Sequence, residues 1–125
     1  MVIVVPEFFQ KAREPWSSYT HFWGAVLFGV GGIGLLVKAG IDRISDLDLA
    51  GVAVFVLSLW LLYNASWVYH YVDLKPDAVL RWRKVDHSMI YVLIAGTYTP
   101  MCFHFYPEPK GVLFALVMWL IAILG

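Results

Sequence analysis

Five polar side chains that could do chemistry interrupt otherwise apolar stretches of the sequence. Ser66 and His70 close the stretch "VAVFVLSLWLLYNASWVYH", and their i, i+4 spacing puts them on one face of a helix. His21 stands near the start of an earlier apolar stretch, while Asp86 and His87 open a later one. A neutral His can bind zinc, an Asp can bind a metal or orient a bound water, and a Ser can support either group by a hydrogen bond. These residue types are therefore those of a metal site that acts on water.

The same residues also have structural explanations. A single His near a membrane interface is commonly hydrogen-bonded or faces the headgroups, and Asp86 with His87 could cap the start of a helix, since Asp suits the N-cap and the first turn. A catalytic zinc requires three protein ligands, whereas the sequence offers His70 as a ligand and Asp86 as a partner. Spacing alone leaves both interpretations open.

Asn64 is excluded from the candidate site. It lies two residues from Ser66 and so points to another face of the helix. We interpret it as a packing or hydrogen-bonding residue. Its sequon, "NAS", would lie within the membrane, where glycosylation is not expected.

The composition is that of a membrane protein. Of the 125 residues 61% are hydrophobic and 14% are charged, against about 45–50% and about 25% in ordinary globular domains. The net charge of zero gives no basic field for nucleic acid. Cys102 is the single cysteine, so it can form no intrachain disulfide, and we expect it to be a packing residue.

We expect an all-α fold, a polytopic bundle of transmembrane helices. Residues 1–15, without the basic start of a secretory signal, are predicted to precede the membrane as a short amphipathic helix at its interface. Residues 73–84 are polar and basic, and Pro76 is expected to break any helix there. A transmembrane domain over residues 16–125 would cross the bilayer with spans near 17–37, 49–72, 86–106 and 111–125.

Charge and chain order predict the topology. Six Lys or Arg residues on one side against three on the other favour a cytoplasmic N-terminus. Antiparallel spans would then bring His21, Ser66, His70 and Asp86 to the inner third of the bilayer, while His104 would lie at the outer interface. Ionisable groups at such depths usually face a bundle interior, form pairs, or mark a functional site.

The fourth apolar segment is short. Its 15 residues would cover about 22 Å of a hydrocarbon core about 30 Å thick. We therefore expect the sequence to be a piece of a longer protein. The alternative is a short native protein whose last helix is half inserted.

The segment "GVGGIG" formally matches a dinucleotide-binding motif. That motif requires a preceding strand and an acidic residue about 20 positions later, whereas this segment lies within an apolar span. We expect its glycines, with a neighbour upstream, to allow close helix packing instead. These residues are Gly24, Gly29, Gly31, Gly32 and Gly34.

Three segments resemble the hemolysin III family, within the progestin and adipoQ receptor superfamily. They are "SSYTHFWGAVL", "SWVYH" and "RKVDHSMIYVLIAGTYTP", and the resemblance covers roughly residues 14–125. It implies a seven-helix protein of the plasma or inner membrane, with a cytoplasmic N-terminus and a zinc ion near the cytoplasmic face. His70 would be a direct ligand, Asp86 would hold the zinc-bound water, and Ser66 would stand beside the site. The remaining ligands, an His-x-x-x-His pair on the seventh helix, are not in this chain, so its metal site is expected to be incomplete.

The resemblance favours, narrowly, a zinc-dependent intramembrane hydrolase that acts on a lipid amide or ester, since distant relatives include alkaline ceramidases. Asp86 would act as a base, and Ser66 would support the oxyanion or the His. The expected partners are the lipid bilayer and a lipid substrate, with no nucleic acid. The alternatives are a receptor or lipid-homeostasis protein with a structural zinc, and a pore-forming cytolysin.

Overall fold

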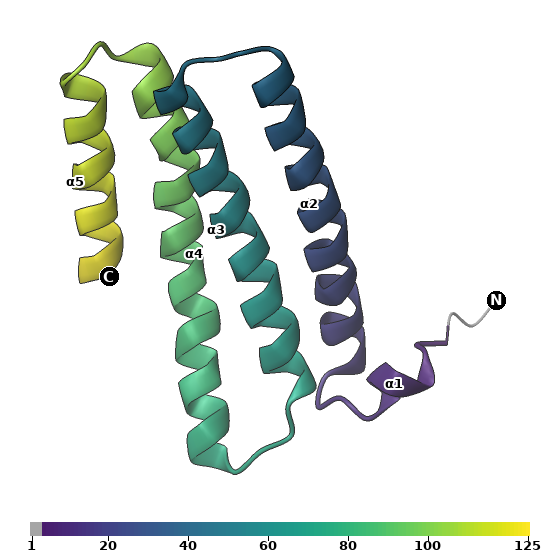
Figure 1. Ribbon diagram of the computed structural model, residues 1–125. Helices are drawn as coiled ribbons and strands as arrows, with labels where there is room; N and C mark the ends of the chain where they lie inside the picture. The colour runs from purple at the N-terminus through teal and green to yellow at the C-terminus, as the bar shows by residue number, and fades with distance from the viewer. Residues whose placement is uncertain (1–3) are drawn as a thin grey trace.

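The computed structural model describes residues 4–125, which form five α-helices joined by short connections (Figure 1). The helices are α1 (Glu7–Gln10), α2 (Pro15–Ile41), α3 (Asp46–Tyr71), α4 (Pro76–Phe105) and α5 (Lys110–Leu124). These described residues include no strand, so the expected all-α fold is confirmed.

Each long helix packs against its neighbours in the chain. The main contacts are between α2 and α3, α3 and α4, and α4 and α5, and α1 packs against α2. The long helices run antiparallel, as Figure 1 shows. The start of α2, the end of α3 and the start of α4 therefore lie at one end of the bundle, together with α1. This end, the lower one in Figure 1, is called the α1 end below.

Small residues form the contacts between the long helices. A Cβ atom added at Gly24 or Gly32 of α2 would collide with Tyr63 or Val56 of α3. This close approach confirms the expected packing role of both glycines. Gly31 and Gly34 do not share it, because a Cβ at either would meet nothing within 4 Å in the described part of the chain. Both are exposed, at positions of α2 that an apolar sequence does not distinguish from its packed positions.

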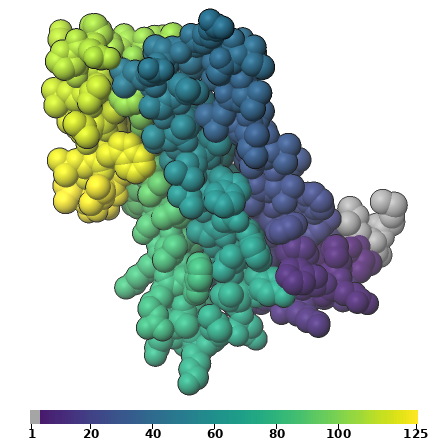
Figure 2. Space-filling view, in the orientation of Figure 1, coloured from purple at the N-terminus to yellow at the C-terminus, as the bar shows by residue number. Residues whose placement is uncertain are grey.

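Helix α4 begins ten residues before the expected third span, and the expectation that Pro76 breaks any helix is wrong. Pro76 is the first residue of α4, after Lys75 in an extended conformation. A proline suits that position, because its missing N–H would have no partner in the first turn and its φ angle is already helical. The cap role considered for Asp86 is excluded as well, since Asp86 lies well inside this 30-residue helix. The first turns of α4 extend beyond the neighbouring helices in Figure 2.

The outer surface of the long helices is apolar. Helices α2 and α3 are long and apolar enough to cross a membrane. Only 22% of the most apolar 18-residue stretch of α2, and 17% of that of α3, is buried within the protein. The core helix of a soluble protein would be mostly buried. Large side chains such as Leu27, Val30 and Ile33 are instead about two-thirds exposed. Within residues 4–125 only α2 and α3 pass this test, so spans at 86–106 and 111–125 remain predictions.

The segment before α2 contains a short helix, as expected, but it is a single turn, α1. Phe9 is buried and packs against Tyr19 and Phe22 of α2. Phe8 stacks on Tyr71 at the end of α3, with ring centroids 4.9 Å apart. The turn therefore covers the junction of α2 and α3. Residues 1–3 of the expected pre-membrane segment lie outside the described residues.

The contact between α3 and α4 gives a stability prediction. A Cβ at Gly51 would lie 2.8 Å from the backbone Cα of Pro100, which cannot turn aside as a flexible side chain would. Gly51→Ala should lower the free energy of unfolding by about 1–3 kcal/mol, the usual cost of overpacking. Gly34→Ala is the matched control and should be neutral or stabilising by up to about 1 kcal/mol, because alanine favours helix. Thermal unfolding in detergent measures both, and equal effects would contradict the packing assignment.

Candidate functional site

Hydrogen bonds between polar side chains and their neighbours join α2 to α3 at the α1 end. The fully buried Ser18 donates to the carbonyl oxygen of Trp67 at 3.1 Å. One turn further along α2, His21 Nδ1 lies 2.8 Å from Oγ of Ser66 and shares a hydrogen bond with it. Ser66 is 5% exposed, so this bond is sheltered from solvent. His21 and Ser66, which were both predicted as site residues, are therefore hydrogen-bond partners in the structure.

Glu14 joins the same group of residues, although no pattern in the sequence indicates it. It is the N-cap residue of α2, but its side chain makes no bond to that helix. Its carboxylate instead accepts a hydrogen bond from His70 Nδ1 at 2.9 Å, and its backbone N–H donates to the His70 carbonyl oxygen at 3.0 Å. Glu14 thus holds His70 by both main chain and side chain. The position of Glu14 directly before Pro15, the first residue of α2, could have marked it as a helix-capping residue. That position does not indicate that its side chain would bond to His70.

The bond to Glu14 determines how His70 can act. A carboxylate only accepts hydrogen bonds, so the proton of a neutral His70 ring is on Nδ1 and its Nε2 carries the free lone pair. A carboxylate or carbonyl partner commonly orients a metal-binding His in this way. The His70 side chain is 16% exposed. Its geometry therefore suits a ligand as well as a hydrogen-bonding residue.

His21 lies beside His70, and Asp86 lies near the same end of the bundle. The ring centroids of His21 and His70 are 5.3 Å apart, with the rings near perpendicular. Asp86 of α4 is close enough for a Coulombic interaction with His21, and its side chain is 15% exposed. The structure thus brings together the predicted residues His21, Ser66, His70 and Asp86. With Glu14 they form a group that we call the polar cluster.

Three other polar residues lie outside the polar cluster. His87 has a 60% exposed side chain, 3.6 Å from its neighbour Asp86. Asn64 donates to the Trp60 carbonyl oxygen at 2.8 Å and accepts from the Trp67 indole at 3.2 Å, which is the hydrogen-bonding role expected of it. His104 lies at the far end of α4, 3.5 Å from Asp48.

The polar cluster is not a complete metal site. Among residues 4–125, no three His, Cys, Asp or Glu side chains are grouped so that they could hold one metal ion. His70 with Glu14 fits the chemistry of one zinc ligand and its orienting carboxylate. A catalytic zinc requires two further protein ligands. The described residues therefore fit part of a zinc site and not the whole of it.

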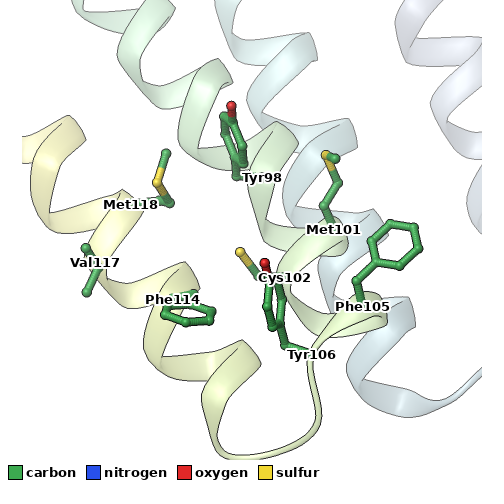
Figure 3. A pocket seen from close by; sticks show the side chains of 8 residues that line it. All are labelled: Tyr98, Met101, Cys102, Phe105, Tyr106, Phe114, Val117 and Met118. Carbon is green, nitrogen blue, oxygen red and sulfur yellow. The ribbon is translucent and has the colours of Figure 1, made fainter.

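An apolar cavity of about 420 Å³ lies between α4 and α5, away from the polar cluster (Figure 3). Aromatic and sulfur-containing side chains line most of it, among them Tyr98, Met101, Phe114 and Met118. Cys102 also lines it and is 6% exposed, which agrees with the packing role expected for this residue. The cavity offers no charged group and adds nothing to the chemistry of the cluster.

An all-α bundle with an apolar outer surface and a group of mostly half-buried polar side chains at one end is the architecture of an integral membrane protein. The sequence comparisons identify its family. The family model described as "Haemolysin-III related" matches residues 9–125. The chain belongs to this family, which confirms the resemblance seen in its sequence.

Two curated relatives show how much of the family protein this chain represents. The Hemolysin-3 homolog of Bacillus subtilis (strain 168) is 31% identical over 117 residues, which cover 94% of this chain and 54% of that protein. Hemolysin-3 of Bacillus cereus is 33% identical over 109 residues, or 87% and 49% respectively. The chain therefore spans about half the length of these relatives. No solved structure matches it.

The bond between His21 and Ser66 predicts a measurable contribution to stability. Ser66→Ala leaves a sheltered imidazole nitrogen without its partner, so the free energy of unfolding should fall by about 1–3 kcal/mol. Ser88→Ala is the control, because the exposed Ser88 bonds only to a carbonyl of its own helix and should change stability by less than about 0.5 kcal/mol. Chemical denaturation in mixed micelles compares the two. Equal losses would show that the bond is not stabilising.

Proposed function

We propose that this chain contributes part of the active site of a zinc-dependent hydrolase that cleaves an amide or ester bond of a membrane lipid. The observation that carries the proposal is the bond between Glu14 and His70. It leaves His70 Nε2 free, at the same end of the bundle as Ser66 and Asp86. A group this polar within apolar helices is costly in a membrane and usually functional.

Each residue of the polar cluster has a role in this proposal. His70 would bind zinc, and Glu14 would fix the orientation of its ring. Asp86 would hold the attacking water and accept its proton, as a carboxylate near the reacting group can. Ser66 would donate to a developing oxyanion, while its bond to His21 fixes its position. Zinc, when bound, supplies a Lewis acid that polarises the carbonyl group and activates water.

The position of the cluster supports a lipid substrate. Helices α2 and α3 present apolar surface along their lengths, and the polar groups gather near their ends. A lipid whose acyl chains lie along such helices would place its amide or ester, near the headgroup, at the depth of the cluster. A water-soluble substrate would gain nothing from the apolar surroundings.

The names of the two relatives, Hemolysin-3 homolog and Hemolysin-3, motivate a second candidate function, a pore-forming cytolysin. The exposed side chains of α2 and α3 argue against it. A pore wall would need polar residues along a whole helix, whereas exposed positions such as Leu27, Val30 and Leu57 are apolar. The hydrolase accounts for the polar cluster, and a pore does not.

The hydrolase can be tested with the protein expressed from its complete reading frame and reconstituted in vesicles that contain ceramides and phospholipids. Fatty acid release should require zinc and should fall at least about a hundredfold in His70→Ala and Asp86→Ala. His104→Ala, at the opposite end of the bundle, should keep the activity. Zinc binding without release from any lipid would favour the receptor, and dye leakage that survives His70→Ala would favour the pore.

The role of Glu14 can be tested without any substrate. Loss of a partner that orients a metal-binding His typically weakens metal affinity about 10–100-fold, and we expect Glu14→Gln to do so in the complete protein. Glu7→Gln, in α1, is the matched control and should leave the affinity unchanged. Competition with a zinc chelator measures both. An unchanged affinity in Glu14→Gln would remove Glu14 from the proposal, while His70 would still be tested by its own variant.

A further inference from the structure

The first turns of α4 form a basic projection at the α1 end. At 1.5 Å per residue the 30 residues of α4 extend about 45 Å, longer than the hydrocarbon core of about 30 Å. If the apolar part of α4 begins at Asp86, residues 76–85 lie outside that core. This segment holds Arg81, Arg83 and Lys84, with Asp77 as its one acidic residue.

The three cations of this projection are exposed and form no ion pair in the described part of the chain. The charged or potentially charged contacts of residues 4–125 involve other side chains: Arg13, Lys38 and the histidines His70, His87 and His104. Arg81, Arg83 and Lys84 are all exposed. Their charges are therefore free to bind an external anion.

Each cation is next to an apolar side chain on the helix surface. Leu80, Arg83, Lys84 and His87 follow the i, i+3, i+4, i+7 pattern of one helix face and line a shallow hollow of about 290 Å³. Another face carries a second hollow of about 250 Å³, where Arg81 stands beside Trp82 and Val85. A ligand that fits such hollows has an anionic group next to an apolar part.

The depth of the cations matches the lipid headgroups. Lys84 and Arg81 are two and five residues before Asp86, which is about 3 Å and 8 Å along the helix axis. The polar layer on each side of a bilayer is about 5–7 Å thick. Arg83 and Lys84 would thus lie at the level of the phosphate groups, with Arg81 at the outer edge of the polar layer.

We propose that the basic projection of α4 binds the headgroup of an anionic phospholipid, with Arg83 and Lys84 on its phosphate and its acyl chains along the exposed apolar side chains of α4 beyond Asp86, such as Ile90. Clusters of Lys and Arg directly beside a transmembrane helix attract anionic lipids. The bound lipid would anchor the start of α4 and so the position of Asp86, which lies two residues beyond Lys84. The proposal is independent of the hydrolase, because it concerns binding alone.

The test compares soluble short-chain phosphatidylglycerol with phosphatidylcholine, titrated into the purified full chain in detergent. The unmodified protein should bind phosphatidylglycerol at least about tenfold more tightly. Arg83→Gln with Lys84→Gln should lower that affinity about tenfold to thirtyfold and leave phosphatidylcholine binding unchanged. Lys38→Gln with Lys110→Gln removes the same charge at the opposite end of the bundle and should change neither affinity.

Three outcomes would overturn the proposal. They are an unmodified protein that does not distinguish the two lipids, equal losses in both double variants, and full competition by glycerol phosphate, which lacks the acyl chains. A further measurement needs no variant: added salt should weaken the binding of phosphatidylglycerol and not that of phosphatidylcholine. A binding preference that salt does not change would also contradict the assignment.

Discussion

The polar cluster depends on the close approach of α2 and α3. Apolar helices gain little from hydrophobic burial against one another in a bilayer, so their association depends on close packing and on hydrogen bonds between them. Gly24 and Gly32 bring the backbone of α2 against Tyr63 and Val56. At this separation the short side chain of Ser66 reaches His21 at 2.8 Å. Bulkier residues along the contact would move the helices apart and leave both polar groups without a partner inside the bundle.

The segment before α2 completes the polar cluster because its backbone N–H groups bind the last carbonyl oxygens of α3. The last carbonyl groups of a helix have no partner within it. Here the backbone N–H groups of Arg13 and Glu14 donate to Tyr71 and His70 at 3.3 and 3.0 Å. These bonds place the Glu14 side chain next to the His70 ring. Glu14 thus both pairs with a free carbonyl group at the end of α3 and orients the ring of His70, the candidate zinc ligand.

The sequence predicted most of the cluster and missed one member for a physical reason. The i, i+4 spacing of Ser66 and His70 and the antiparallel order of the spans were sufficient to bring His21 and Asp86 to the same end. Glu14 was missed because its partner depends on the path of an irregular connection, which no periodicity describes. The start of α4 was misplaced because proline was taken as a helix breaker, although it suits the first helical position. The free sides of Gly31 and Gly34 were not predictable, since a helix that is apolar all round does not show which side packs.

The hydrogen bonds that hold the rings of His21 and His70 affect how a metal ion would bind. His70 is held by Glu14 and His21 by Ser66, and these bonds lie within α2, α3 and the segment before them. The rings therefore have a defined orientation that does not depend on an ion. A ligand fixed in advance loses little conformational freedom on binding, which strengthens the binding. Among residues 4–125 no three possible ligands are grouped around one point, so a zinc ion held by His70 would need two further protein ligands from elsewhere.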